Sequence, residues 1–146
     1  MRVAIGADWV GFDLKQGLAE HVEALGHVVL DLGADSGEAN DYPDYAEKVG
    51  RAITAGEADV GIVICGTGIG MSIAANKIKG VRAALCHDAF TTERARGHND
   101  ANVLAMGALV VSLPHAAQLV EVFLGSPYEG GRHEARLAKI RSLEDA

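Results

Sequence analysis

The chain has little of what marks secreted, membrane-spanning or polyanion-binding proteins. Its 146 residues include two cysteines, Cys65 and Cys86, which form no CxxC pair, so a disulfide framework is excluded. No apolar run approaches the roughly 20 residues that a membrane-spanning helix needs. Basic residues number 13 against 20 acidic ones, and the net charge of -7 excludes a general nucleic-acid-binding or membrane-binding surface. A small anionic substrate needs only a local basic cluster and stays compatible with this charge.

The chain also lacks linkers, repeats and low-complexity tracts. A strand-like run at residues 2–7 follows the first methionine directly, so we expect no signal peptide and a cytoplasmic protein. Hydrophobic residues make up 49% and charged residues 23%, which is typical of a globular protein. We expect residues 1–146 to form a single domain.

Short apolar runs alternate with segments of helical periodicity. The expected strands are 3–7, 28–32, 60–65, 81–86 and a fifth strand or bent pair at 103–106 and 109–111. The expected helices are 14–25, 46–53, 71–78, 88–97, 119–124 and 135–143. Strands separated by helices of this length indicate a parallel sheet. The predicted fold is therefore α/β, a Rossmann-like three-layer sandwich with a five-stranded, mainly parallel sheet flanked by helices.

Ligands of such sheets bind beyond the carboxyl ends of the strands. The segments that we place at this edge are Asp8-Trp9, 33–44, 65–70, 87–88 and the residues around His98. These segments hold most of the side chains that could carry out chemistry. We therefore expect the functional site at this edge.

The most informative segment is the glycine loop 65–70, Cys-Gly-Thr-Gly-Ile-Gly, between a predicted strand and a predicted helix. Alternating glycines let backbone N–H groups converge on an anion or an oxyanion. The loop is not a dinucleotide fingerprint, because Met71 stands where the third glycine would fall. It is not a P-loop either, since no Gly-Lys-Ser/Thr follows. A tight turn without a ligand is the alternative interpretation.

Cys65 gives the loop a reactive group. A thiol that ends a strand and faces the start of a helix favours its thiolate form. A thiolate can act as a general base or as a nucleophile near neutral pH. A buried structural cysteine is the alternative, and Cys86 fits that alternative well.

Five stretches together carry a resemblance to a known family. They are Gly-Ala-Asp at 6–8, Asp-Tyr-Pro-Asp-Tyr-Ala at 41–46, the segment 64–77, Gly-His-Asn-Asp-Ala-Asn-Val-Leu at 97–104, and Tyr-Glu-Gly-Gly-Arg-His at 128–133. In this order they resemble ribose-5-phosphate isomerase type B, a family that includes the galactose-6-phosphate isomerase subunits. The resemblance implies an aldose–ketose isomerase of the pentose phosphate pathway. It implies conversion of ribose 5-phosphate to ribulose 5-phosphate through a cis-enediolate, with no cofactor.

The resemblance also implies catalytic roles. Cys65 would abstract the proton beside the carbonyl group and return it to the neighbouring carbon. Thr67 and the backbone N–H groups of Gly66, Gly68, Ile69 and Gly70 would hold the developing oxyanion. Asp8 and His98 would open the furanose ring, one taking a proton from the anomeric hydroxyl and the other protonating the ring oxygen.

Other residues are candidates for binding the substrate. Arg132 and Arg136 are four residues apart at the start of the last predicted helix, so they project from one face and could clamp a phosphate. A solvated basic face is the alternative for this pair. Asn99 would contact sugar hydroxyls, and Tyr42 would line the pocket near the base. The histidines show no spacing typical of a ligand set, so we expect no metal.

The chain departs from the family pattern at two positions. Trp9 follows Asp8 where the family usually has histidine, and Leu109 stands where many relatives carry arginine. Both changes remove positive charge or hydrogen-bond donors from the phosphate end of the pocket. A four- to six-carbon aldose or aldose phosphate other than ribose 5-phosphate is therefore an alternative substrate.

Two further alternatives and the assembly remain open at this point. Cys65 and His98 could form a Cys–His hydrolase, or the chain could be a non-catalytic sugar-phosphate-binding subunit. The resemblance implies a homodimer or a tetramer with active sites at the interface between subunits. We expect no nucleic-acid or membrane partner.

Overall fold

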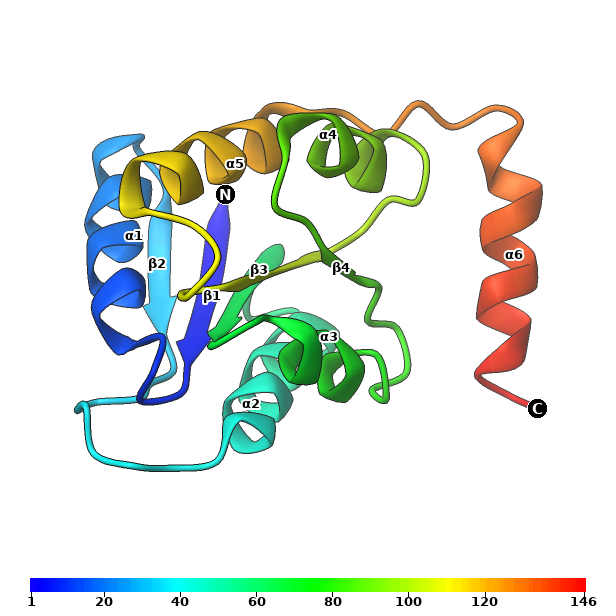
Figure 1. Cartoon of the computed structure of the whole chain (residues 1–146). Helices are drawn as coiled ribbons and strands as arrows, with labels where there is room; N and C mark the ends of the chain where they lie inside the picture. Colours follow the sequence, from blue (N-terminus) through cyan, green and yellow to red (C-terminus); the bar gives the residue numbers. More distant parts are fainter.

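The computed structural model describes all residues, 1–146, and contains one five-stranded sheet (Figure 1). The strands are β1 (Arg2–Ala7), β2 (Val28–Asp31), β3 (Val60–Cys65), β4 (Ala83–Leu85) and β5 (Val103–Gly107). Their order is β2-β1-β3-β5-β4, and every neighbouring pair is parallel. The predicted α/β, Rossmann-like fold is confirmed.

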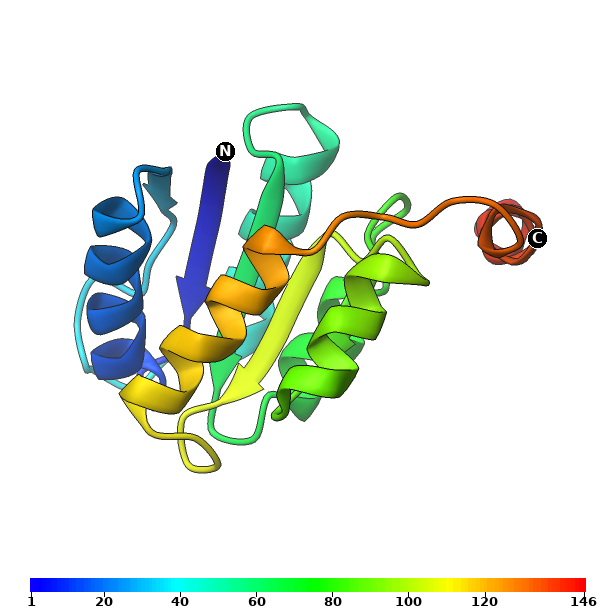
Figure 2. The ribbon, with the colours of Figure 1, turned by 90° about the horizontal axis from the view of Figure 1, so that it is seen from above.

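Helices cover both faces of the sheet. They are α1 (Phe12–Ala24), α2 (Tyr42–Thr54), α3 (Ile69–Ala75), α4 (Ala89–Gly97), α5 (Leu113–Gly125) and α6 (His133–Leu143). Helices α1, α4 and α5 pack on one face, and α2 and α3 pack on the other (Figure 2). None of the helices combines the length and apolar character that crossing a membrane requires.

The central strand β3 explains why both faces are covered. All six of its residues are buried. Because side chains alternate along a strand, Ile62 and Ile64 enter the core under α1 and α5, while Val63 and Cys65 enter the core under α2 and α3. Burying such an aliphatic side chain contributes about 1.5–3 kcal/mol. A continuous apolar run is therefore the expected sequence of this strand.

Residues 109–111 do not form the strand or bent pair that their apolar character predicts. They belong to the turn that follows β5. The N–H groups of Ala108 and Leu109 donate to the carbonyl oxygens of Cys65 and Gly66, at 2.8 and 3.0 Å. These two bonds continue the pairing with β3 for two residues beyond β5. The chain then turns toward α5.

Helix α5 begins at Leu113, six residues before the predicted start at 119. Ser112 caps it by accepting a hydrogen bond from the N–H of His115, and Pro114 lies in the first turn. This first turn is exposed except for Ala116. It therefore lacks the apolar periodicity on which the prediction relied.

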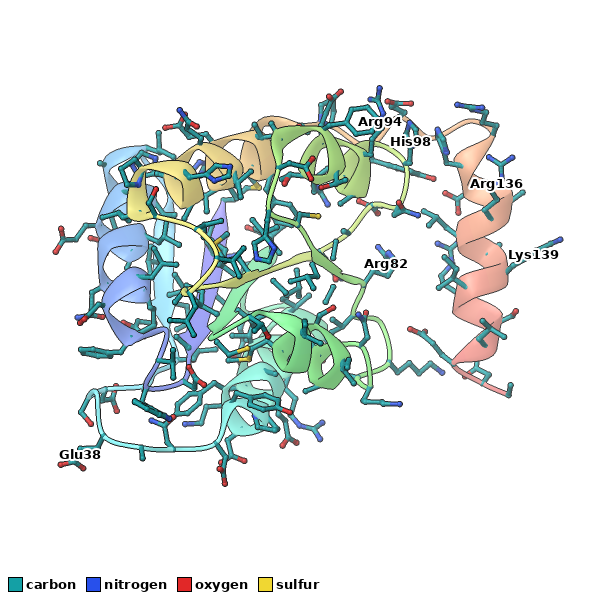
Figure 3. The ribbon with its side chains drawn as sticks, viewed as in Figure 1. Glu38, Arg82, Arg94, His98, Arg136 and Lys139 are labelled. Atoms are coloured by element: carbon teal, nitrogen blue, oxygen red, sulfur yellow. The ribbon has the colours of Figure 1, made fainter.

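Helix α6 stands away from the sheet at the end of an extended connection (Figures 1 and 2). Its far end is attached to the loop before β4, where Glu144 accepts a hydrogen bond from the N–H of Gly80 at 2.7 Å and Asp145 pairs with Lys79. The near end, with Arg136, lies at the same end of the molecule as His98 (Figure 3).

Candidate active site

The thiol of Cys65 lies at the carboxyl end of the central strand. Its Sγ accepts a hydrogen bond from the N–H of Gly68 at 3.2 Å, and the side chain is buried. Gly68 has a positive φ of 79°, and a Cβ at this position would lie 2.7 Å from the carbonyl carbon of Met106. Only glycine can therefore direct this N–H at the sulfur. Such a bond stabilises a thiolate, as a base or nucleophile requires.

The rest of the glycine loop is held from several sides. Thr67 Oγ1 accepts a hydrogen bond from the N–H of Ile69 at 3.3 Å. A Cβ at Gly70 would overlap the ring of Tyr42, so this ring lies directly against the loop. The ring of Tyr42 therefore lies against the loop that carries both Cys65 and Thr67.

Asp8 and Trp9 follow β1 at the same edge. The N–H of Asp8 donates to the carbonyl oxygen of Ile64 at 3.2 Å, and its carboxylate accepts from the N–H of Gly11 at 3.0 Å. Asp8 is buried, whereas Trp9 is 48% exposed. We call the residues gathered at this edge the carboxyl-edge group: Asp8, Trp9, Tyr42 and residues 65–70.

His98 lies at the opposite edge, so its predicted place at the carboxyl ends of the strands is wrong. Helix α4 runs back across the sheet and ends at Gly97, and His98 precedes β5, which begins at Val103. The register of the sheet pairs Gly107, at the far end of β5, with Cys65. The five residues of β5 at about 3.3 Å each therefore separate His98 from Cys65 by roughly 15 Å along the strand direction.

His98 is part of a cluster that sequence reasoning missed. Its ring stacks on that of His133, with centroids 4.1 Å apart and planes at 20°. Glu129 Oε2 lies 3.6 Å from Nε2 of His98 and 3.4 Å from Nε2 of His133. Glu129 and His133 are four residues apart, and this spacing was the signal that could have revealed the cluster.

Arg132 and Arg136 lie at this second edge and are exposed. Arg132 occupies the N-cap position of α6 without a capping hydrogen bond from its side chain, and neither arginine forms an ion pair within the chain. By contrast, Arg141 on the same helix pairs with Glu134. Both guanidinium groups are therefore free to bind an anion. We call His98, Asn99, Arg132 and Arg136 the amino-edge group.

A sequence model of the ribose/galactose isomerase family matches residues 3–140. The chain belongs to this family. It is 48% identical to ribose-5-phosphate isomerase B of Escherichia coli, over 98% of this chain and 96% of that protein. Its structure resembles that of Clostridium thermocellum ribose-5-phosphate isomerase B, with a TM-score of 0.98, 46% identity, and coverage of 99% and 98% of the two chains. It is also 41% identical to D-erythrulose-4-phosphate isomerase of Pectobacterium atrosepticum, over 99% and 95% of the two chains. Membership of this family confirms the predicted aldose–ketose isomerase.

One group of side chains in this isomerase could hold a metal ion. The ligand atoms of His98, Glu129 and His133 all lie within 4.8 Å of one another. The rings of His98 and His133 are stacked, with an angle of 20° between their planes, so the lone pairs in the two ring planes run nearly parallel and do not converge on one point. An ion bound to both would lie well out of at least one ring plane, whereas imidazole ligands bind in the plane. The arrangement as it stands is a carboxylate between two imidazoles, and metal binding would require one ring to turn.

We predict that exhaustive chelation leaves turnover of the sugar phosphate unchanged. The reason is that the cluster of His98, Glu129 and His133 would need one ring to turn before it could hold an ion, and an enediolate can be stabilised by N–H donors alone. The measurement is kcat/KM before and after dialysis against a strong chelator, with metal analysis of the dialysed protein. Activity that disappears with the chelator and returns with Zn²⁺ or Mn²⁺ would contradict the prediction.

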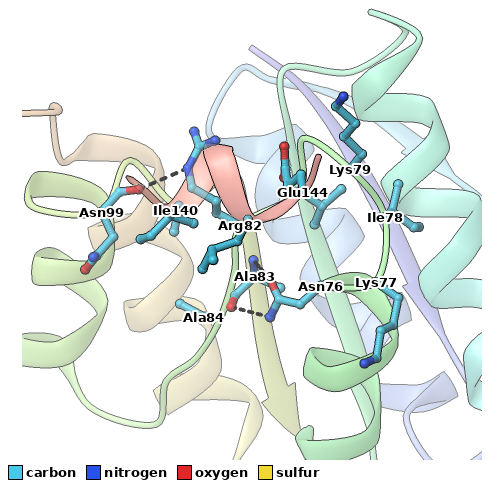
Figure 4. A pocket seen from close by; sticks show the side chains of 13 residues that line it. Asn76, Lys77, Ile78, Lys79, Arg82, Ala83, Ala84, Asn99, Ile140 and Glu144 are labelled. Atoms are coloured by element: carbon cyan, nitrogen blue, oxygen red, sulfur yellow. Dashed lines mark hydrogen bonds between the residues drawn. The ribbon is translucent and has the colours of Figure 1, made fainter. Parts of the chain in front are cut away.

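A cavity of about 580 Å³ separates α6 from the loop 76–82 and the start of β4 (Figure 4). Asn76 bonds to the backbone of Ala83 on its floor, and Arg82 donates to the carbonyl oxygen of Asn99. Of the predicted site residues only Asn99 lines this cavity. The cavity does not include Cys65, and the chemistry of the carboxyl-edge group does not take place in it.

Cys86 has the features of a structural cysteine. It belongs to the core under α1, α4 and α5. Burial raises the pKa of its thiol, and hydrogen bonds with Thr91 and Thr92 only partly oppose this effect. A thiol of this kind is not reactive near neutral pH.

Proposed function

We propose that the chain interconverts ribose 5-phosphate and ribulose 5-phosphate, with Cys65 as the base. The observation that carries the proposal is the hydrogen bond from Gly68 N–H to Cys65 Sγ at the carboxyl end of β3, because an N–H donor aimed at sulfur would stabilise a thiolate base. The names of the relatives in Escherichia coli and Clostridium thermocellum support the substrate. Two unpaired cysteines support a cytoplasmic location.

In the proposed reaction, Asp8 and His98 first open the sugar ring by general acid–base catalysis. The thiolate of Cys65 then takes the proton from C2 of the open-chain aldose, and the electron pair moves onto the carbonyl oxygen to give the enediolate. Thr67 and the N–H groups of the glycine loop stabilise this oxyanion, by about 3–4 kcal/mol per donor in other enzymes. Cys65 returns the proton to C1 while a proton moves between the two oxygens, so the product is an isomer.

We propose further that the active site forms between two copies of the chain. In a single chain Cys65 and His98 lie at opposite edges of the sheet. A homodimer could bring the carboxyl-edge group of one subunit against the amino-edge group of the other. Apolar side chains that a second copy would cover support this arrangement, and they are Ile69, Ile73, Phe90, Leu109 and Val110, each more than half exposed. The projecting α6, which carries Arg136, also supports it (Figure 2).

A four-carbon sugar phosphate is a second candidate substrate. Trp9 and Leu109 stand where the family pattern has a histidine and often an arginine, and both are exposed at or beside the carboxyl edge. Neither can bind a phosphate as those residues do. The relative in Pectobacterium atrosepticum is named for D-erythrulose 4-phosphate.

We predict that Trp9→His raises kcat/KM for ribose 5-phosphate relative to four-carbon substrates. Histidine occupies less volume than tryptophan, so the longer substrate can enter far enough for its phosphate to receive the new hydrogen bond. Such a charge-assisted bond contributes about 1.5–3 kcal/mol, or roughly a ten- to hundredfold gain. The measurement is kcat/KM for a panel of four- to six-carbon sugar phosphates and free sugars in D₂O, with both proteins. The ketose formed from the true substrate should carry solvent deuterium.

Trp9→Phe is the matched control, because it keeps an aromatic ring and adds no donor. It should not change the ranking of the substrates. An unchanged ranking in Trp9→His would show that Trp9 does not determine the substrate. A panel in which no sugar phosphate yields a ketose would overturn the proposed function.

A further inference from the structure

His87 lies two residues after β4, beside the end of β5. Its Nε2 is 2.9 Å from the backbone nitrogen of Gly107 and accepts that N–H. A backbone amide can only donate, so Nε2 must carry a lone pair. The ring is therefore neutral, with its proton on Nδ1.

Gly107 leads into the turn that holds the glycine loop. A Cβ at Gly107 would lie 2.6 Å from the Cα and carbonyl carbon of Thr67, so the two backbones are in direct contact. The next two residues, Ala108 and Leu109, donate their N–H groups to the carbonyl oxygens of Cys65 and Gly66. The position of the 107–109 turn thus sets the position of the loop backbone.

We propose that His87 is a positioning residue for the isomerisation, because its neutral ring fixes the 107–109 turn and, through it, the loop that carries Cys65. Protonation of the ring removes the acceptor for the N–H of Gly107 and releases this turn. The inference rests on the proposed role of Cys65. His87 itself does not touch the substrate.

The surroundings of His87 favour the neutral ring. Burial lowers the pKa of His87 below 6.5, and the nearby His115, in the first turn of α5, lowers it further. Asp88, which caps α4, acts in the opposite direction. The ring is therefore neutral at pH 7, and the acceptor is lost only as the pH falls below 6.5. Activity should decline over that range for this reason, beyond any decline due to other groups.

Two variants separate the hydrogen bond from the bulk of the side chain. In His87→Gln an amide oxygen can accept the N–H of Gly107 at every pH, so kcat at pH 7.5 should stay within about threefold of wild type and the decline below pH 6.5 should weaken. In His87→Leu no acceptor remains, and kcat should fall by about 10- to 100-fold, as misplacement of catalytic groups typically causes. KM should change less than kcat in both.

His115→Gln is the matched control. It should keep kcat at pH 7.5 and move the midpoint of the acid decline to higher pH, because it removes a charge that disfavours protonation of His87. His98 is present in all these proteins, so its own titration cannot cause a difference between them. The same acid decline in wild type and His87→Gln would overturn the proposal, as would full kcat in His87→Leu.

A spectroscopic test does not depend on turnover or on the folding of a variant. Nitrogen NMR of the wild-type protein with labelled histidine should show His87 as the Nδ1–H tautomer at pH 7.5. The Nε2–H tautomer would overturn the proposal even if activity assays agreed with it. If no sugar phosphate is turned over, the proposed function fails, while the tautomer still decides whether His87 holds Gly107.

Discussion

Replacing Cys65 with alanine is expected to lower kcat by about 10³-fold or more, the range of a lost general base. The substitution removes the thiolate that takes the proton from C2, and the N–H of Gly68 loses its acceptor. Binding should persist, because the phosphate and the sugar hydroxyls contact other residues in the proposed site. The measurement is kcat on the best substrate, together with the Kd of a substrate analogue and deuterium exchange at the carbon beside the carbonyl group.

Two controls make the Cys65 result specific. Cys65→Ser keeps the size of the side chain but supplies a hydroxyl, a much weaker acid than a thiol, and should be nearly as inactive. Cys86→Ala removes the other buried thiol from the core under α1, α4 and α5, and should lower Tm while keeping kcat. Deuterium exchange that survives in Cys65→Ala would mean that a different residue is the base.

The sequence predicts most of the fold because burial on two faces leaves a clear pattern. The strand 60–65 is predicted to the residue, since all six of its residues are buried and every side chain except that of Gly61 enters one of the two cores. Gly26 and Gly56 mark the ends of α1 and α2, and both have positive φ. The first turn of α5 escaped prediction because it is mostly exposed and its stability comes from the Ser112 cap.

The site could be predicted only in part, because the order of strands in the sheet is not visible in the sequence. β5 lies between β3 and β4, which brings the 107–109 turn against the Cys65 loop and His87 behind that turn. Nothing local to His87 indicates this contact. The edge of His98 could have been predicted, because a residue between the helix 88–97 and a following parallel strand lies at the amino ends of the strands.

The separation of Cys65 and His98 leads to the last prediction, that two inactive variants restore activity together. Cys65→Ala and His98→Ala should each be nearly inactive as homodimers. In a mixed dimer, one site combines both substitutions, and the other combines the intact Cys65 of one subunit with the intact His98 of its partner. One of the two sites of each mixed dimer is then intact, so the isolated mixed dimer should show about half of wild-type activity if the dimer is two-fold symmetric.

The experiment uses co-expression with two affinity tags, which isolates the mixed dimer and avoids slow subunit exchange. The matched control is a mixed dimer in which one subunit carries Cys65→Ala and the other carries Asp8→Ala. Both residues belong to the carboxyl-edge group, so each subunit contributes them to the same site. Every site of that mixed dimer then carries one defect, so no activity should return, although the subunits associate equally well. Recovery in the first pair and not in the second assigns the two edges to different subunits. An isolated mixed dimer of the first pair that is as inactive as its parents, or a monomer with full activity, would refute the shared site.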